Sequence, residues 1–191
     1  MIRRSFLALG LAASLVLPAL AQGGPEDTLV IEVEGKGAVE IALRPDLAPQ
    51  HVARIKELAR AGAYDGVAFH RVIEGFMAQT GDVEFGKRDA FASGRAGTGG
   101  SDLPDLPAEF TGAASFDRGV VGMARSMDPD SANSQFFIMF APAPHLDGQY
   151  TIVGEVVSGQ EVVDGLARGA GSSGTVADPD YMSRVYVKSD G

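Results

Sequence analysis

The stretch FHRVIEGFMAQTGD, at residues 69–82, carries the most informative pattern in the chain. Side chains alternate between the two faces of a strand, so Arg71 is predicted to share a face with Phe69 and Ile73. A cation on an apolar face has two interpretations. It is either a surface arginine beside an ordinary core or a hydrogen-bond donor in an apolar site, and this stretch alone leaves both open.

The residues after the strand add to this picture. Gly75 permits a bend that brings Phe76 and Met77 towards Arg71, where they can close an apolar patch. Gln79 contributes an amide within reach of the same cation. The predicted group therefore contains a cation, apolar side chains and an amide, but no nucleophile.

Four further segments give this pattern a family context. They are GTGG at 97–100, MAR at 123–125, SQFFI at 134–138 and HLDG at 145–148. Together with residues 69–82, these segments resemble the cyclophilin family of peptidyl-prolyl cis-trans isomerases. The resemblance extends from about residue 28 to the C-terminal strand, and its motifs stand in the right order.

The resemblance implies a mostly β fold: a closed eight-stranded antiparallel β-barrel capped by two α-helices, formed by a single domain at 28–191. Hydrophobic periodicity agrees with many short strands and two helices. A helix is predicted to begin at Pro49 and to stop at Gly62, with one apolar stripe facing the sheet. The second helix is predicted at 161–168, and the strands at 28–34, 39–43, 69–73, 120–124, 135–140, 149–157 and 185–188.

The resemblance also implies roles for individual residues. Arg71 is expected to be the catalytic donor, and Gln135 a second catalytic residue that holds Arg71 or the substrate backbone. Gln79 is expected to support Arg71. The backbone carbonyl and N–H of Arg125 are expected to meet the peptide as a strand would, and Ala124 is expected to be a substrate-binding residue. The residues expected to line the proline pocket are Phe76, Met77, Phe137 and Leu146. Each apolar residue has an alternative interpretation as ordinary core, and Gln135 as a solvated polar residue of a strand.

Two positions depart from the common family pattern. His145 stands where eukaryotic members usually carry Trp, and Tyr150 stands where many carry His. Both are expected to border the substrate site. The departures leave the arginine-centred machinery intact but predict weak binding of cyclosporin. The segment from 123 to 135 looks like the bacterial, exported branch of the family.

Residues 1–21 are predicted to be a signal peptide. Arg3 and Arg4 precede an apolar run at 6–20, and Ala19 and Ala21 supply small residues at a cleavage position. An uncleaved anchor is the alternative. Cleavage would leave a flexible leader at 22–27 and place the protein in the periplasm or outside the cell, with no membrane attachment. Sec export is favoured over twin-arginine export, which the Arg pair also permits.

Amino-acid composition limits the classes of molecule that the protein is expected to bind. The 191 residues carry a net charge of −9, which argues against nucleic acid. There is no Cys, and the three His residues stand at no metal-ligand spacing, so no metal or cofactor is expected. A monomer that takes proline-containing peptide segments is expected. The Gly-rich loop at 86–101 is a solvent loop or a border of the substrate site; it lacks the Lys of a phosphate-binding loop.

The leading functional hypothesis is a peptidyl-prolyl cis-trans isomerase that assists the folding of exported proteins. The alternative is a chaperone that binds proline segments without significant turnover. A hydrolase is disfavoured because the sequence has no Gly-x-Ser-x-Gly elbow and no Ser in a recognisable triad context.

Overall fold

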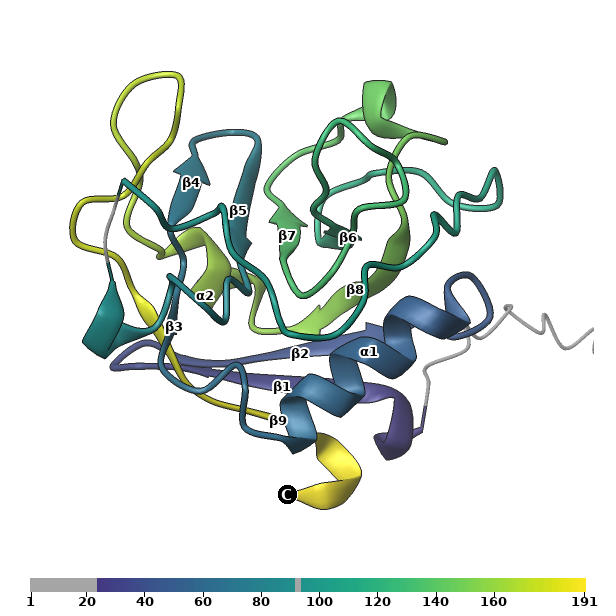
Figure 1. Cartoon of the computed structure of the whole chain (residues 1–191), viewed down its shortest axis with the longest axis horizontal. Helices are drawn as coiled ribbons and strands as arrows, with labels where there is room; N and C mark the ends of the chain where they lie inside the picture. Colours follow the sequence, from purple (N-terminus) through teal and green to yellow (C-terminus); the bar gives the residue numbers. More distant parts are fainter. Residues whose placement is uncertain (1–23, 92–93) are drawn as a thin grey trace, which may run out of the picture.

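The computed structural model describes residues 24–91 and 94–191 and consists mainly of short strands with two α-helices (Figure 1). The predicted signal peptide at 1–21 lies outside the described residues, as does the start of the predicted leader; the leader's last residues, Pro25–Asp27, form a 3-10 turn. The helices are α1 (Pro49–Arg60) and α2 (Gln160–Asp164). The strands are β1 (Thr28–Val33), β2 (Gly37–Leu43), β3 (Val67–Ala68), β4 (Arg71–Ile73), β5 (Met77–Thr80), β6 (Val120–Met123), β7 (Phe136–Met139), β8 (Ile152–Ser158) and β9 (Tyr181–Val187).

The N-terminal third follows the periodicity of its sequence closely. β1 and β2 form the predicted antiparallel hairpin, and Gly35 takes the positive φ of 68° that the turn requires. Pro49 occupies the first turn of α1, where its missing N–H costs nothing. Val52, Ile55 and Leu58 form the buried stripe of this helix against the sheet.

No helix among residues 24–91 and 94–191 is long and apolar enough to cross a membrane.

The strands form one open, strongly curled half-barrel, so the prediction of a closed eight-stranded barrel was wrong. The nine strands are ordered β3-β9-β1-β2-β8-β6-β7-β5-β4. Its two end strands, β3 and β4, follow each other along the chain and are separated only by Phe69 and His70. Two segments that run nearly end to end in this way cannot pair side by side, and a ladder between them would be needed to close the barrel.

The free side of β4 is covered by a C-terminal segment, residues 169–176. Gly169 N–H donates to the Val72 carbonyl at 2.9 Å, and Val72 N–H donates to the Gly174 carbonyl at 2.7 Å. Val176 N–H donates to the His70 carbonyl at 3.0 Å. This irregular segment thus supplies hydrogen-bond partners to the backbone groups at the sheet edge, in place of a regular strand.

Two C-terminal boundaries differ from prediction. Helix α2 is shorter than the predicted 161–168, because Gly165 N–H already turns back onto the last carbonyls and Ala167 N–H donates to the Asp180 carboxylate at 2.7 Å. The chain therefore leaves the helix to meet the segment before β9. That strand begins at Tyr181, earlier than the predicted 185, because it pairs with β3 as well as β1.

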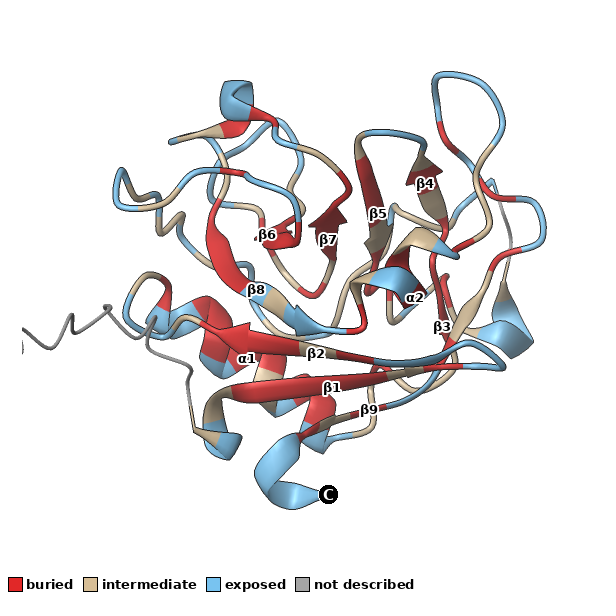
Figure 2. Cartoon of the chain, turned by 180° about the vertical axis from the view of Figure 1, so that it is seen from behind, coloured by how far each residue is buried: buried red, intermediate tan, exposed pale blue. Residues whose placement is uncertain are grey.

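Figure 2 shows in red the buried residues along β1, β2 and β8 and on α1. The buried apolar residues form two clusters. The larger, which we call the main core, lies between the curled sheet and the helices and includes Phe136, Val72 and Phe69. Phe69 was predicted to share the face of Arg71, which is wrong: Phe69 lies outside both β3 and β4, so strand alternation does not continue through it. The smaller cluster, which we call the site core, contains Met77, Phe116, Val120, Phe137, Met139, Ala143, Leu146 and Ile152.

Candidate active site

Arg71 is held from two sides at the start of β4. Its Nε donates to the Ser173 carbonyl at 2.9 Å, and its Nη1 donates to Gln79 Oε1 at 3.2 Å. Nη2 has no hydrogen-bond acceptor within the described residues. Burial lowers the pKa of the guanidinium and the nearby Tyr150 opposes that shift, but an arginine remains charged at neutral pH. The result is a fixed cation with donor capacity left over.

A chain of hydrogen bonds continues from Arg71 through two side-chain amides. Gln79 Nε2 donates to Gln135 Oε1 at 3.0 Å, and Gln135 Nε2 donates to the Gly99 carbonyl at 2.7 Å. Arginine can only donate and a carbonyl can only accept, so the two ends of the chain fix the orientation of both amides. Each amide is therefore held in one orientation by its neighbours.

Beside Arg71 lies an apolar cavity of about 190 Å³. Its floor belongs to the site core, through Met77, Phe137 and Leu146. Phe137 stacks on Phe116 at a centroid distance of 5.7 Å, and Tyr150 meets the Phe137 ring edge-on, also at 5.7 Å. Such pairs favour one ring position over others. The lining residues are Arg71, Phe76, Met77, Gln79, Ala124, Arg125, Phe137, Leu146 and Tyr150.

The rim residue Arg125 uses its side chain within the protein. Its Nε and Nη2 donate to the Gln149 carbonyl at 3.1 and 2.9 Å, and its guanidinium lies over the Tyr150 ring at 4.5 Å. Within the described part of the chain, the backbone N–H and carbonyl of Arg125 have no hydrogen-bond partner. Arg125 therefore offers a peptide its backbone rather than its charge, in keeping with the predicted strand-like contact.

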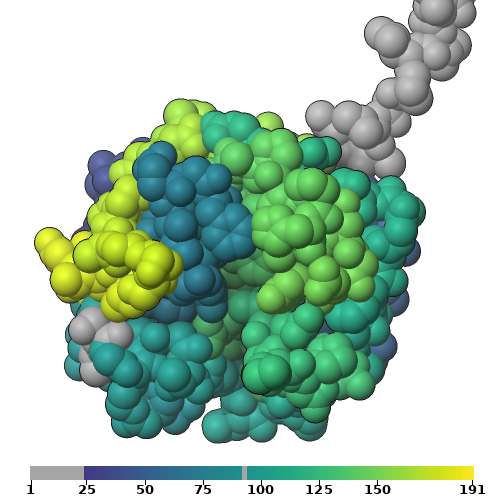
Figure 3. Space-filling view, turned by 90° about the horizontal axis from the view of Figure 1, so that it is seen from above, coloured from purple at the N-terminus to yellow at the C-terminus, as the bar shows by residue number. Residues whose placement is uncertain are grey.

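A second cavity of about 240 Å³ adjoins the first, and we call it the polar cavity because most of its lining residues have polar side chains. The two share Gln79, Ala124 and Arg125. Residues 97–99 border this second cavity, so the Gly-rich loop lies beside the site, as one of its two interpretations held. Figure 3 shows this face from above, hollowed between the dark-blue segment that carries β4 and β5 and the green and teal segments opposite.

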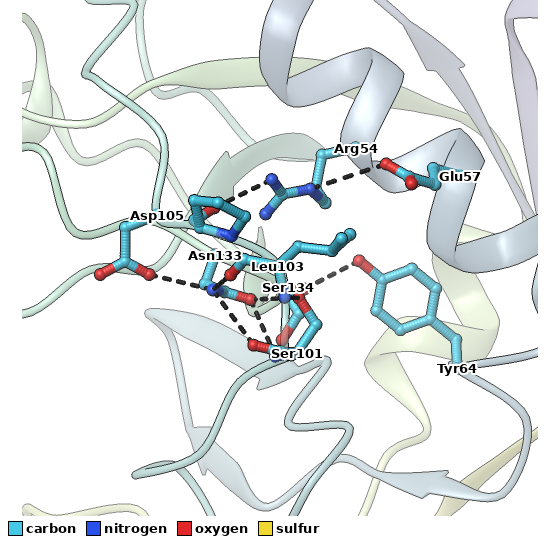
Figure 4. A network of polar contacts seen from close by, with 9 residues as sticks. Arg54, Glu57, Tyr64, Ser101, Leu103, Asp105, Asn133 and Ser134 are labelled. Atoms are coloured by element: carbon cyan, nitrogen blue, oxygen red, sulfur yellow. Dashed lines mark hydrogen bonds and ion pairs between the residues drawn. The ribbon is translucent and has the colours of Figure 1, made fainter.

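A partly buried network of polar contacts holds the two residues that precede Gln135, Asn133 and Ser134 (Figure 4). Tyr64 OH donates to the Ser134 carbonyl at 2.9 Å, and Ser134 Oγ donates to the Gly81 carbonyl at 2.7 Å. Asn133 Oδ1 accepts from Ser101 N–H at 2.8 Å. Burial raises the pKa of Tyr64, which keeps its phenol protonated as a donor. The backbone that precedes Gln135 is thus fixed before the side chain enters the chain of hydrogen bonds from Arg71.

All eleven predicted site residues gather on this face, although their roles remain predictions. Nine line the apolar cavity; Gln135 lines the polar one, and His145 stacks on Phe76 at 6.1 Å. Sequence reasoning missed the carbonyl groups of Ser173 and Gly99. Both act through the backbone, so their side chains gave no signal, although the Gly-rich stretch around Gly99 did suggest a border of the site.

Comparisons with known proteins identify the family of this chain. The family "Cyclophilin type peptidyl-prolyl cis-trans isomerase/CLD" matches residues 28–187. A probable peptidyl-prolyl cis-trans isomerase of Brucella suis is 53% identical over 188 residues, covering 97% of this chain and 93% of the relative. Peptidyl-prolyl cis-trans isomerase B of Bacillus subtilis is 36% identical over 157 residues, covering 82% of this chain and 94% of the relative.

Solved structures give the same result. The crystal structure of cyclophilin AquaCyp293 from Hirschia baltica matches with a TM-score of 0.73 and 27% identity, covering 88% of this chain and 76% of that one. A Cryptosporidium parvum cyclophilin-type isomerase, crystallised in the presence of the dipeptide Ala-Pro, matches with a TM-score of 0.72 and 25% identity, covering 84% and 98%. The chain belongs to the cyclophilin-type peptidyl-prolyl cis-trans isomerase family, and peptidyl-prolyl cis-trans isomerase is its enzyme class.

Proposed function

We propose that this enzyme accelerates rotation about X-Pro bonds in exported proteins while they fold, with Arg71 as the hydrogen-bond donor to the prolyl nitrogen. One observation carries the proposal. A guanidinium fixed by the Ser173 carbonyl and the Gln79 amide forms one wall of an apolar cavity. The donor and the pocket for an apolar ring are therefore neighbours.

The chemistry of the bond explains why this pair of features suffices. The isomers of an X-Pro bond differ by only about 0.5–1 kcal/mol, but amide resonance sets a barrier of about 18–20 kcal/mol between them. As the amide twists, its nitrogen regains a lone pair that can accept a hydrogen bond. A donor aimed at this nitrogen stabilises the twisted state and neither planar one, which is the condition for catalysis. No bond is broken and no proton is transferred.

The remaining residues hold the proline ring of the substrate in place and leave its acyl side free to rotate. Phe76, Met77 and Phe137 hold the proline ring by apolar contact. The unpaired backbone groups of Arg125 bind the peptide in an extended form. Arg71, already fixed on both sides, requires little reorganisation when the amide twists. The ring therefore stays in place while the acyl side rotates.

An isomerisation assay on a proline tetrapeptide tests the catalytic proposal, with peptide binding measured in parallel. An isomerase gives a rate enhancement proportional to enzyme concentration. The alternative function, a chaperone that binds proline segments, gives binding and suppression of aggregation without a change in isomerisation rate, and that outcome would overturn the proposal.

Export is supported by the N-terminal sequence rather than by the site. Arg3 and Arg4 precede an apolar run at 6–20, and Ala19 and Ala21 supply small residues at a cleavage position. Mass spectrometry of the protein from the envelope fraction of its native cell tests this part. A mature N-terminus at Gln22 in the periplasmic or secreted fraction supports export; an intact Met1 in the cytoplasmic fraction contradicts it.

A further inference from the structure

Asp82, the last residue of the motif at 69–82, is a buried carboxylate with four backbone donors. Its exposed fraction is 0%. Oδ1 accepts from the N–H groups of Glu84 and Phe85 at 3.1 and 2.8 Å, and Oδ2 accepts from those of Gly97 and Gly99 at 2.7 and 3.0 Å. Burying an ionised carboxylate is costly unless hydrogen bonds replace its water. These four bonds provide that replacement.

The two oxygens of Asp82 connect different parts of the chain. Oδ1 closes a local turn two and three residues away, whereas Oδ2 reaches 15 and 17 residues ahead to the loop that borders the polar cavity. A carboxylate can serve both sides because both of its oxygens accept. An asparagine has a single acceptor oxygen, so it can hold only one side.

Gly99 transmits this anchoring to the site. Its N–H is held by Asp82, and its carbonyl accepts from Gln135 Nε2 at 2.7 Å. Gln135 in turn accepts from Gln79, and Gln79 accepts from Arg71. A continuous path of hydrogen bonds therefore joins the buried carboxylate to the guanidinium, through a single loop residue.

We propose that Asp82 is a positioning residue for the isomerisation reaction: through the loop at 97–99 it fixes the Gly99 carbonyl, and thereby the orientation of Gln135, Gln79 and Arg71. The proposal rests on the role proposed above for Arg71. Asp82 itself touches no substrate. The proline pocket is built separately, on the site core, so loss of the anchor is expected to affect turnover more than binding of the ring.

Two variants break the same link from opposite ends. Asp82→Asn removes one acceptor with almost no change in volume. Gly99→Ala leaves the carboxylate in place, but the added Cβ would lie 2.6 Å from Asp82 Oδ1 and 2.8 Å from Glu84 Cβ, so the loop must move away. Because Gly99 is only partly buried, the second variant remains informative if the first fails to fold.

Each variant has a matched control. Gly94→Ala makes the same substitution in the same loop, where an added Cβ meets nothing within 4 Å. Asp65→Asn removes a carboxylate whose Oδ1 accepts from Val185 N–H at 2.8 Å, at β9 and away from the site. Circular dichroism and thermal unfolding establish the folded fraction of every variant.

The expected result is a fall in kcat of about 10- to 100-fold for Asp82→Asn and Gly99→Ala, the scale on which misplaced catalytic groups reduce rates. KM and the affinity for a proline peptide change by less than that fall, and both controls keep wild-type turnover. In a Gln135→Leu background, Asp82→Asn is expected to cause no further fall in kcat, because its effect passes through Gln135.

Two outcomes would overturn the proposal. One is wild-type kcat in folded Asp82→Asn and Gly99→Ala proteins. The other is a fall in kcat that is unchanged by Gln135→Leu, which would show that Asp82 does not act through Gln135. Arg71→Ala, measured alongside, keeps this test separate from the proposed function. Wild-type turnover in that variant contradicts the role of Arg71, whereas the coupling between Asp82 and Gln135 is measured independently of it.

Discussion

Phe136 and Phe137 are neighbours on β7, yet they belong to different cores. Phe136 packs in the main core, where its ring meets Tyr64 edge-on at 5.6 Å. Phe137 points the other way, into the site core, and lines the apolar cavity. Adjacent residues of a strand point to opposite faces, so on β7 a residue of the main core is followed directly by a residue of the pocket. The pocket therefore has its own small core, distinct from the main one.

Truncating each of these two rings should separate stability from binding. Phe136→Ala is expected to lower the free energy of unfolding by about 3–5 kcal/mol, the usual cost of a large cavity, without changing the KM of the folded fraction. Phe137→Ala is expected to cost less stability, because one side of its ring already faces a cavity, and to raise KM. Denaturant unfolding and steady-state kinetics measure both. An unchanged KM for folded Phe137→Ala would contradict this division of the cores.

Substitution of Arg71 tests whether the enzyme retains turnover when the pocket lacks this proposed donor. Loss of a preorganised donor commonly costs about 10²- to 10³-fold in rate, so Arg71→Ala is expected to lose that much turnover while it keeps its fold. Arg71→Lys retains the charge but loses the planar fork that reaches Ser173 and Gln79 together, and should also be badly impaired.

Isomerisation rates, peptide affinity and circular dichroism for the wild type and both Arg71 variants provide the measurement. Affinity is expected to fall less than turnover, since the apolar cavity remains. Near wild-type turnover in folded Arg71→Ala would assign the donor role to another group.

The buried side chain of His70 should make the stability of the protein depend on pH. The ring is buried, and neither ring nitrogen has a hydrogen-bond partner within the described residues. Burial lowers the pKa of His70 below its usual 6.5; Asp82 opposes this shift and Arg71 adds to it. The unfolded chain therefore takes up a proton first, so the stabilising contribution is complete above pH 6.5 and is lost as pH falls towards the lowered pKa.

Denaturant unfolding at pH values from neutral to mildly acidic measures this loss. The carboxylate of Glu109, whose pKa is also lowered, responds only at more acidic pH. His70→Gln is expected to flatten the dependence just below pH 6.5. An equal slope in both proteins would assign that pH dependence to another group.

The smallest expected effect concerns the rim rather than either core. His145 stacks on Phe76 at the edge of the pocket. Cyclosporin is expected to inhibit the wild-type enzyme weakly. The His145→Trp variant is expected to be inhibited more strongly, because an indole presents a larger apolar face and an N–H donor to the drug. Inhibition titrations of both forms decide the question. Equally tight inhibition of both would show that this position does not control drug binding.

Prediction from sequence succeeded where a local pattern carried the information. The hairpin of β1 and β2, helix α1 and the grouping of Arg71 with Phe76, Met77 and Gln79 all follow from periodicity or from a contiguous motif. Prediction failed for features that depend on contacts between segments distant in the sequence. Barrel closure depends on which strand ends meet, and the end of α2 depends on Asp180, neither of which a local pattern contains.

The same distinction holds within the site. Asp82 was visible in the motif, but its partners at Gly97 and Gly99 are backbone N–H groups, which no side-chain pattern reveals. The Ser173 carbonyl is hidden for the same reason, and it lies 102 residues from Arg71. Side-chain identity therefore predicted the residues that face the pocket, and could not predict the backbone groups that hold them.

The C-terminal segment that covers β4 has a consequence for the order of events during synthesis. A nascent chain carries the whole motif at 69–82 long before residues 169–176 emerge. Arg71 has its Ser173 acceptor, and the side of β4 that faces away from β5 has its backbone partners, only once that segment has arrived. Contacts between such distant residues also form late in folding, because long loops must close first. The Arg71 guanidinium of a newly made chain can therefore be fixed from both sides only when synthesis is nearly complete.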